Sequence, residues 1–217
     1  MAEPVSAADT RQRLLEAAGE VFAEQGFRAT TVREICQRAR ANIAAVNYHF
    51  GDKEHLYAEV LRYAHRCAMD KYPPELGLPE TAAATQRLRA FIQSFLLRIF
   101  DEGSPAWHGK LMAREMIEPT QALDTLVDTE IRPRAEQLAA IVRLLSGPQM
   151  SEDQVQMCAM SIVGQCVFYH HARPLIVRLN PAQRFTAQEV ARLAEHITQF
   201  SLAALQHLAR PGEGSSS

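Results

Sequence analysis

The sequence lacks a long apolar run. No stretch approaches the roughly 18 apolar residues that a membrane-spanning helix needs. It also shows no secretory signal, so we expect a cytoplasmic protein. At 217 residues the chain is long enough to bury a substantial core. It can hold one large domain, or a small domain followed by a larger one.

An excess of positive charge is missing as well. Lys and Arg number 23 against 25 Asp and Glu, a net charge of −2, so no global basic field points to nucleic acid. One segment differs, because between Arg28 and Lys53 five basic residues oppose two acidic ones, a local charge of +3. The basic residues are Arg28, Arg33, Arg38, Arg40 and Lys53, and the acidic ones are Glu34 and Asp52. A local basic footprint suits a protein that touches DNA with one end only.

Cysteine is scarce, and its spacing is not that of a metal site. The four cysteines show no C-x-x-C pair, and in a reducing compartment we expect most of them to be buried as small hydrophobic residues. Cys166 and His170 are four residues apart on a predicted helix, with His171 adjacent. No convincing third and fourth ligand lies nearby in the sequence, so we expect no metal and no cofactor.

The common catalytic motifs are also absent. The sequence contains no G-x-S-x-G, no Walker loop, no Rossmann glycine fingerprint and no H-E-x-x-H. The nearest approach to an active site is Glu115 with His108 and Trp107, which keeps an α-helical enzyme or a ligand carrier as the alternative function. Turnover would identify an enzyme, whereas salt-dependent binding to a palindromic duplex would identify a regulator. We expect no enzyme.

The stretch from Thr31 to Lys53 predicts two short helices joined by a tight turn. Thr31 and Glu34 form a capping-box pair, which starts a helix at Val32. Its apolar stripe consists of Val32, Ile35, Cys36 and Ala39. Asn42 is a good N-cap for the second helix, in which Ile43, Val46 and Phe50 share the inward face.

The outward face of the second helix is unusual for a solvated surface. It carries Ala44, Ala45, Asn47 and Tyr48, which are uncharged and mostly small. A face of small residues lets a helix backbone come close to the edges of bases in a major groove. Spacing alone also permits a helical hairpin inside an all-α core. A purely structural helical dimer would leave this face unexplained.

The same segment resembles the DNA-binding signature of TetR-family transcriptional regulators. The resemblance rests on Thr30-Thr31-x-x-x-Ile35, on the run from Asn42 to Phe50 and on Lys53-Glu54, and it extends from about Arg11 to Leu61. The sequence departs from the common pattern at Arg40, where glycine is usual, and at Asn47, where an aromatic residue is usual. Weaker similarity in the C-terminal half resembles the CecR-type subgroup. The resemblance implies a homodimeric repressor of a double-stranded operator, released by an inducer.

The DNA contacts that we expect fall into two groups. Phosphate contacts are predicted for Thr31, Tyr48, His49 and Lys53, and base-edge contacts for Asn42, Ala44, Ala45 and Asn47. Arg33 and Ile43 complete the predicted DNA-binding surface.

Helical periodicity continues through the rest of the chain, and the fold class is all-α. A helix from Asp9 or Thr10 ends at Gly26, and Asp52 caps another that runs to Lys71. Further helices are predicted over 81–101, from the Ser104 N-cap to 117, over 121–145 with an interruption at Pro133, over 151–171 and over 186–209. The predicted domains are a disordered start at 1–8, a helix-turn-helix DNA-binding domain at 9–54, an effector-binding and dimerisation domain at 55–209 and a disordered tail at 210–217.

Broad apolar side chains on the later helices predict a pocket for a small apolar or amphipathic effector, although core packing explains most of them equally well. The candidate walls are Phe91, Phe95, Trp107, Met112, Met116, Met160 and Phe168. Glu115 is the candidate polar group that orients a cationic or hydrogen-bonding ligand.

The last helix carries a seam that is suited to packing against another helix. Its members are Val190, Leu193, Ile197, Phe200 and Ala204, at alternating steps of three and four. The helix before it is apolar all round and needs cover on both sides. The sequence therefore predicts either a large monomer core or a dimer interface here, and we expect the dimer interface.

Overall fold

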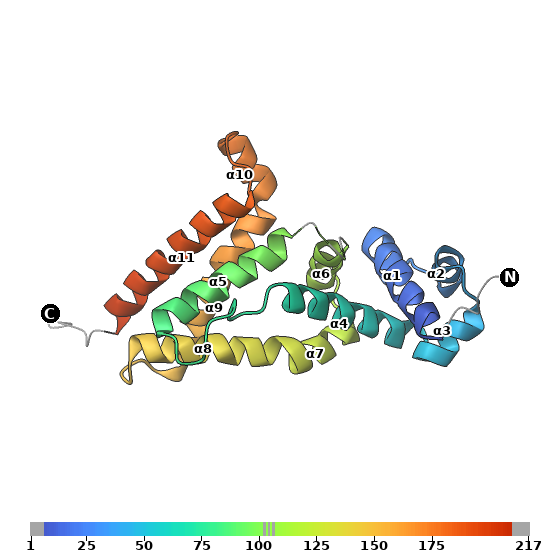
Figure 1. The fold of residues 1–217 in the computed structure, drawn as a ribbon, viewed down its shortest axis with the longest axis horizontal. Coiled ribbons are helices and arrows are strands. Elements are labelled where there is room, and N and C mark those ends of the chain that lie inside the picture. Colours follow the sequence, from blue (N-terminus) through green and yellow to red (C-terminus); the bar gives the residue numbers. More distant parts are fainter. Residues whose placement is uncertain (1–6, 102, 104, 106, 210–217) are drawn as a thin grey trace. The chain divides into compact units, whose positions relative to one another are not determined.

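A computed structural model of the chain describes residues 7–101, 103, 105 and 107–209, and every regular element in that part is helical (Figure 1). The elements are α1 (Ala7–Gln25), α2 (Val32–Ala39), α3 (Ile43–Phe50), α4 (Lys53–Lys71), α5 (Ala84–Phe100), α6 (His108–Ile117), α7 (Gln121–Leu126), the π-helical turn η1 (Val127–Ile131), α8 (Arg132–Ser146), α9 (Glu152–His171), α10 (Arg173–Leu179) and α11 (Ala187–Leu208). The all-α prediction is confirmed. Ala7 and Ala8, expected in a disordered start, already belong to α1. The predicted cap Ser104, the remaining N-terminal residues and the predicted tail lie outside the described residues.

The chain packs as two compact units. The first contains α1 to α3, α4 as far as Ala68, α6, α7 and η1. The second contains the end of α4 from Met69, α5 and α8 to α11. These packing units do not coincide with the predicted functional boundary between residues 54 and 55, because α6 and α7 join the N-terminal helices. That functional boundary stays a prediction.

The core of the first unit is built on α1. The side chains predicted to form it are all buried, namely Leu14, Ala18, Val21, Phe22, Ile35, Val46 and Phe50. Leu111 of α6 joins the same cluster. Ile43, predicted to pack inward, is the first residue of α3 and is instead 50% exposed.

Local caps fix the turn between α2 and α3. Arg40 ends α2 in the left-handed conformation (φ 51°), the conformation that glycine adopts most easily. At the start of α2, the Thr31 hydroxyl accepts from the Glu34 N–H at 3.3 Å. In a full capping box the Glu34 carboxylate would also accept from the Thr31 N–H. It accepts instead from Gln25 Nε2. Only half of the predicted capping box therefore forms.

Helix α6 is attached to α1 by a close approach and by two hydrogen bonds. The Trp107 ring lies on Gly19, where an added Cβ would be 2.1 Å from the ring atom Cζ2. Arg114 donates from Nε to the Ala23 carbonyl at 2.9 Å and from Nη2 to the Glu24 carbonyl at 2.6 Å. These carbonyls belong to the last turn of α1, where backbone acceptors lack helical partners.

The interruption predicted at Pro133 is present as a π-helical turn. Five residues, Val127–Ile131, adopt this wider turn between α7 and α8. Proline has no N–H to donate, and its ring clashes with the carbonyl four residues earlier. A π-turn just before Pro133 relieves that clash without breaking the helical path.

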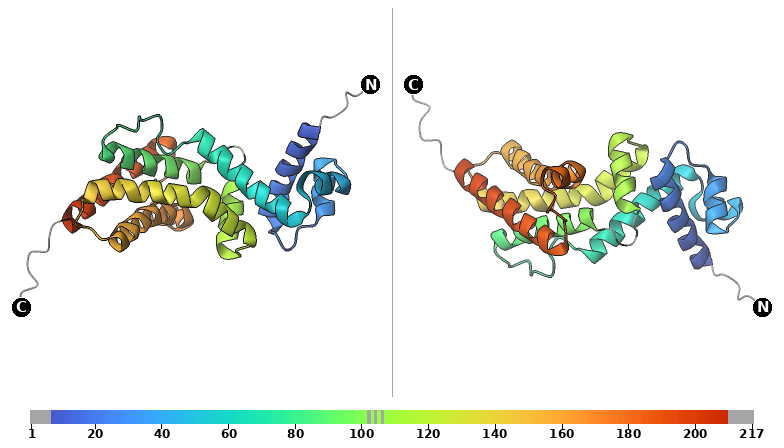
Figure 2. Two further views of the ribbon diagram at one scale, coloured as in Figure 1. Left: turned by 90° about the horizontal axis from the view of Figure 1, so that it is seen from below. Right: turned by 90° about the horizontal axis from the view of Figure 1, so that it is seen from above.

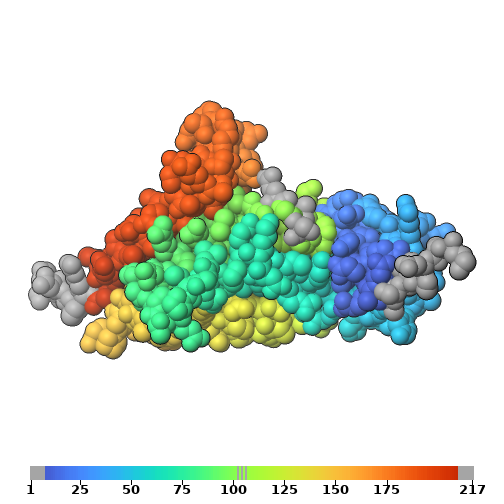
Figure 3. Space-filling view, in the orientation of Figure 1, coloured from blue at the N-terminus to red at the C-terminus, as the bar shows by residue number. Residues whose placement is uncertain are grey.

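The second unit is organised around α5, which packs against α9 and most extensively against α11 (Figures 1 and 2). The apolar side chains of α8 complete this core. The predicted capping boxes Ser151–Gln154 and Thr186–Glu189 both form, and they start α9 and α11. Helix α10 was not expected from periodicity, and it stands out from the rest of this unit with the adjoining ends of α9 and α11 (orange in Figure 3).

Candidate nucleic-acid interface

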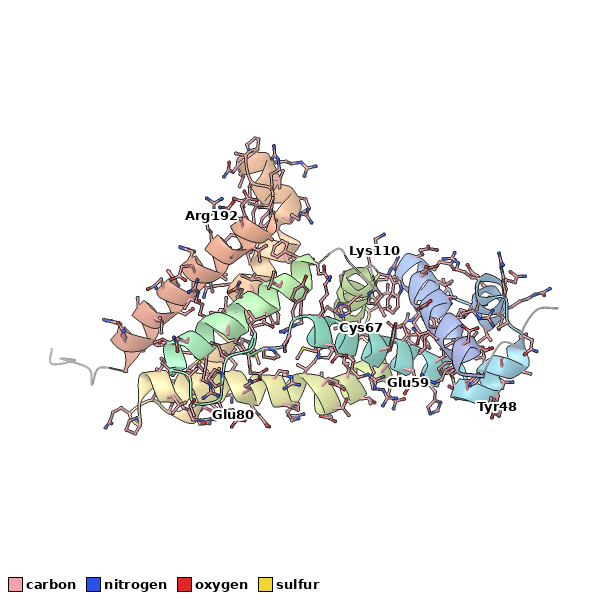
Figure 4. The ribbon with its side chains drawn as sticks, in the orientation of Figure 1. Tyr48, Glu59, Cys67, Glu80, Lys110 and Arg192 are labelled. Carbon is pink, nitrogen blue, oxygen red and sulfur yellow. The ribbon has the colours of Figure 1, made fainter. Side chains whose placement is uncertain are left out.

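The predicted outward face of α3 is exposed in the structure. Tyr48 is 81% exposed and points away from the helices that carry it (Figure 4). Ala44 and Asn47 are also exposed, whereas Ala45 is half-buried against the core. Val46 and Phe50 anchor the opposite face in that core. The result is a rigidly mounted helix that presents small, uncharged side chains to its surroundings.

The side chain of Asn42 has two polar groups, and one of them is hydrogen-bonded within the protein. Its side-chain carbonyl Oδ1 accepts from the Ala45 N–H at 2.8 Å, which confirms it as the N-cap of α3. Its amide Nδ2 has no protein acceptor within the described part of the chain. That amide therefore remains available to an external acceptor at the N-terminal end of α3.

Lys53, predicted to contact phosphate, is turned inward. Its ammonium group donates to the carbonyls of Phe27 and Thr30 at 3.0 and 3.1 Å. It also lies 4.4 Å from the centroid of the Phe27 ring, a cation–π contact. Lys53 thus holds the loop between α1 and α2 in place. Its partners are more than twenty residues away in sequence, so spacing could not identify this role.

The cationic groups that are left for phosphate are three arginines. Arg28, Arg33 and Arg40 are exposed and have no hydrogen-bond or ion-pair partner among the described residues. Arg38 differs, because it forms a two-bond pair with Glu24 at 3.0 Å, which lowers the pKa of that carboxyl. Of the three free arginines, the predicted DNA-binding set contained only Arg33.

Thr31 and His49, the two remaining residues predicted to contact phosphate, both interact with neighbouring groups of the protein. Thr31 is exposed, although its hydroxyl is engaged in the N-cap of α2. His49 is half-buried, with its ring 4.9 Å from the Tyr48 ring in an edge-on contact.

Glu115, predicted to orient a ligand, is fully occupied by the protein. It is 0% exposed, and its Oε2 accepts from the Tyr57 hydroxyl at 2.5 Å. Its Oε1 accepts from the Thr120 N–H at 2.7 Å and from the Thr120 hydroxyl at 2.8 Å. Burial, together with the hydrogen bond to Glu115, raises the pKa of Tyr57. The carboxylate is a structural connection between α4 and α6.

The other predicted effector walls are dispersed. Trp107 and Met112 pack on the core of the first unit, and Met116 is 52% exposed. In the second unit Phe91 is buried and Phe95 packs on the core, but Met160 and Phe168 are 62% and 58% exposed. Phe91 lines a cavity of about 480 Å³ that also involves Glu75, Gln137 and Ile141.

The exposed apolar side chains of α9 form a stripe of their own. Met157, Met160, Gly164 and Phe168 recur at steps of three and four residues, and all four are exposed. Met160 and Phe168 therefore belong to a surface stripe and not to a closed pocket wall.

The seam predicted on α11 divides in the same way. Val190 and Ile197 are buried in the core of their own chain, so these two positions are corrected from interface to core. Leu193 is half-buried, whereas Phe200 and Ala204 are exposed. Together with Leu208, the last two give α11 an exposed apolar face.

No group of three or more His, Cys, Asp or Glu side chains within the described ranges is placed to hold a metal ion. Cys166 is buried, which raises the pKa of its thiol to about 12. None of the helices that the structure describes is long and apolar enough to cross a membrane.

Two family models match the chain. Residues 14–60 match the bacterial regulatory proteins of the tetR family, and residues 84–205 match the C-terminal domain of the HTH-type transcriptional dual regulator CecR. The chain belongs to the TetR family of bacterial regulatory proteins, with a C-terminal domain of the CecR type. The first match covers α2 and α3, so this TetR-family protein is a DNA-binding transcriptional regulator.

Individual relatives agree with this assignment. The HTH-type transcriptional dual regulator CecR of Shigella flexneri is 24% identical over 196 residues, which is 87% of each chain. The HTH-type transcriptional repressor NicS of Pseudomonas putida is 34% identical over 92 residues, covering 41% of this chain and 42% of that protein. The solved structure of the TetR-family transcriptional regulator PfmR from Thermus thermophilus has a TM-score of 0.61 at 21% identity, covering 88% of this chain and 95% of that one. These relatives are transcriptional regulators and not enzymes.

Proposed function

We propose that two copies of this regulator bind one palindromic operator as a repressor, and that a small effector releases them. The observation that carries the DNA-binding part is the exposed, uncharged face of α3, with Ala44, Asn47 and Tyr48 on it. Three exposed arginines without a partner among the described residues, Arg28, Arg33 and Arg40, lie on α2 and in the loops at its two ends, and they supply positive charge for phosphates. Repression is proposed because relatives such as NicS are transcriptional repressors.

Two exposed apolar stripes support a dimer. One lies on α9 and the other on α11, and both helices pack on α5 in the same unit. Contiguous exposed apolar surface of this kind marks an interaction site. A two-fold dimer repeats one surface on both partners, so one stripe of each chain covers the equivalent stripe of the other.

Helix α4 supports a route for release. It is one continuous helix that begins three residues after α3 and ends with Met69–Lys71 in the second unit. An effector that binds better to a conformation with a displaced α4 lowers operator affinity. By reciprocity, operator weakens effector binding by the same factor, typically ~5–150-fold.

Selection of binding sites from random duplex DNA tests the operator part of this proposal. We expect an inverted repeat whose half-sites are about one DNA turn apart, ~34–36 Å, or a multiple of it. Affinity should fall steeply as salt rises, because phosphate contacts release counterions. Enrichment of a single unrepeated site, or an affinity that does not depend on salt, would contradict the proposal.

A further inference from the structure

The second unit contains a guanidinium group that forms no ion pair with a carboxylate in the part of the chain that the structure describes. Arg98, near the end of α5, donates from Nη1 to the Tyr72 carbonyl at 2.9 Å and to the Ser94 hydroxyl. Its carbon Cζ lies 5.6 Å from the centroid of the Phe95 ring. Its other N–H groups have no acceptor among the described residues. Burial, followed by the nearby charge of Arg134, lowers the pKa of Arg98 to about 10, so it remains a cation at neutral pH.

A second arginine adds to this positive charge. Arg134 of α8 has a buried Nε without a hydrogen-bond partner, and it forms no ion pair within the described ranges. Glu75 is the nearby carboxylate, but it accepts its hydrogen bond from Gln137 at 2.6 Å and pairs with neither arginine. Two cations therefore lie near one carboxylate, and that carboxylate is hydrogen-bonded to Gln137. Because the second positive charge has no carboxylate partner among the described residues, this arrangement is suited to an anion from outside the chain.

The two arginines do not line the 480 Å³ cavity themselves, but both lie on helices that line it, α5 and α8. Phe91 and Ile141 line that cavity from α5 and α8, and its polar lining includes Gln137, Arg87, Glu75 and Glu80. Arg98 is seven residues after Phe91, and Arg134 is seven residues before Ile141. Seven residues are two helical turns, roughly 10 Å along each axis, so each arginine shares a face with its cavity residue. Because α5 and α8 run in opposite directions, both arginines lie toward the same end of the groove between these helices (Figures 1 and 2).

We propose that Arg98 and Arg134 bind the carboxylate of an amphipathic effector whose apolar body occupies the groove between α5 and α8. This inference rests on the proposed effector-controlled function and specifies the ligand's chemistry. Guanidinium groups pair with carboxylates through two parallel hydrogen bonds, and Arg98 still has the donors to do so. Phe91 and Ile141 supply the apolar walls. The site therefore selects an acid, whereas the sequence predicted a cationic or hydrogen-bonding ligand at Glu115.

The position of Arg98 also connects this site to the DNA-binding helices. The Tyr72 carbonyl that it holds is the first one after α4. Lys71, the last residue of α4, forms an ion pair with Asp101 at 2.7 Å, so the end of α5 holds the end of α4 at two points. An anion that binds the Arg98 guanidinium competes with the Tyr72 carbonyl for its N–H groups, and so weakens one of these two interactions. Binding at the site therefore bears on the element that leads to α3.

Paired acids and amides provide the test. The probes are octanoate, benzoate and 4-phenylbutyrate, each compared with its neutral amide by calorimetry on the full-length protein. We expect at least one acid to bind at least tenfold more tightly than its amide. Arg134→Gln should abolish that preference. Arg143→Gln is the matched control and should preserve it, because Arg143 is an exposed arginine of α8 that pairs with Glu152 of α9. If no acid in the panel is preferred over its amide, or if the Arg134→Gln protein keeps that preference, the proposed carboxylate site is contradicted.

Thermal unfolding gives an independent measurement. Because Arg134 repels Arg98 and has no ion-pair partner among the described residues, Arg134→Gln should raise the Tm of the ligand-free protein by a few degrees. An arginine with a purely structural role would show the opposite, a lower Tm, which would overturn the proposal.

Operator affinity, measured with and without the preferred acid, separates the two proposals. Acid binding that depends on Arg134 but leaves operator affinity unchanged would support the site and contradict effector-controlled release.

Discussion

At the scale of single residues, Tyr48 and Asn47 should affect DNA binding in different ways. Both side chains are exposed on α3, so replacing either with alanine should leave the fold intact. Tyr48→Ala should weaken binding to every duplex, because it removes a predicted phosphate contact. Asn47→Ala should change preference at one position of each half-site by ~1–3 kcal/mol, because it removes a predicted base contact.

Competition between operator and scrambled duplexes, read by fluorescence anisotropy, separates these effects. The thermal unfolding curves of both variants serve as the folding control. A Tyr48→Ala protein that binds both duplexes as tightly as wild type would remove Tyr48 from the interface. An unchanged sequence preference in Asn47→Ala would remove Asn47 from base recognition.

His170 should make stability fall as the pH falls below the ordinary histidine pKa of 6.5. Burial, and then the neighbouring charges of His171 and Arg173, lower its pKa below the ordinary 6.5. A lowered pKa means that the unfolded chain binds the proton more readily. The stabilisation is therefore fully present above pH 6.5, and it is lost as the pH falls through the lowered pKa. Urea unfolding as the pH is lowered through 6.5 should show wild type losing stability relative to His170→Gln, and a constant difference between them would contradict the prediction.

The roles of single residues could be predicted from the sequence only where they depend on neighbours a few positions away. The N-cap Asn42, the buried Val46 and Phe50 and the exposed Tyr48 were predictable, because caps and periodicity act over a few residues. Glu115 was assigned incorrectly because its partner Tyr57 is 58 residues away. The partners of Lys53 were hidden for the same reason. Ionisable side chains acquire their roles from distant parts of the chain.

At the scale of elements, the contact of α6 with α1 requires glycine at position 19. An alanine Cβ there would meet the Trp107 ring at 2.1 Å, so Gly19→Ala should destabilise the protein by ~1–3 kcal/mol. In a helix interior alanine normally stabilises by ~0.5–1 kcal/mol over glycine. Gly109→Ala in α6 is the matched control, since a Cβ there meets nothing within 4 Å, and it should be stabilising.

Chemical denaturation of both variants, and of Gly19→Ala combined with Trp107→Ala, tests this packing. With the ring removed, the alanine at position 19 should become favourable. A Gly19→Ala protein as stable as Gly109→Ala would show that Trp107 does not lie on α1.

Most elements followed from the sequence, because caps and prolines mark their ends. Examples are the capping boxes at Ser151 and Thr186 and the helix interruption at Pro133. The α5 helix begins at Ala84 and not at Thr81, a shift of the size expected at helix ends. Helix α10 was missed because its seven residues, Arg173–Leu179, are too short for a clear period. Periodicity also could not decide whether the stripes of α9 and α11 face their own core or a partner.

At the scale of the whole molecule, we expect dimer assembly to depend on the exposed apolar stripes of α9 and α11. Replacing Met160 and Phe200 with glutamate should give monomers, because both side chains are at least 60% exposed and no internal packing is lost. Ile197→Glu is the contrast, since its side chain is 0% exposed in the chain's own core and its replacement should unfold the second unit. Light scattering distinguishes a folded monomer from an unfolded chain.

Sedimentation of labelled operator with increasing protein tests the central claim most directly. We expect two chains to bind each inverted repeat, and to bind together even at low protein concentration. We also expect the Met160→Glu/Phe200→Glu protein to occupy single half-sites at much lower affinity. A wild-type complex with one chain per duplex, or a double variant that binds the operator as tightly as wild type, would contradict the account.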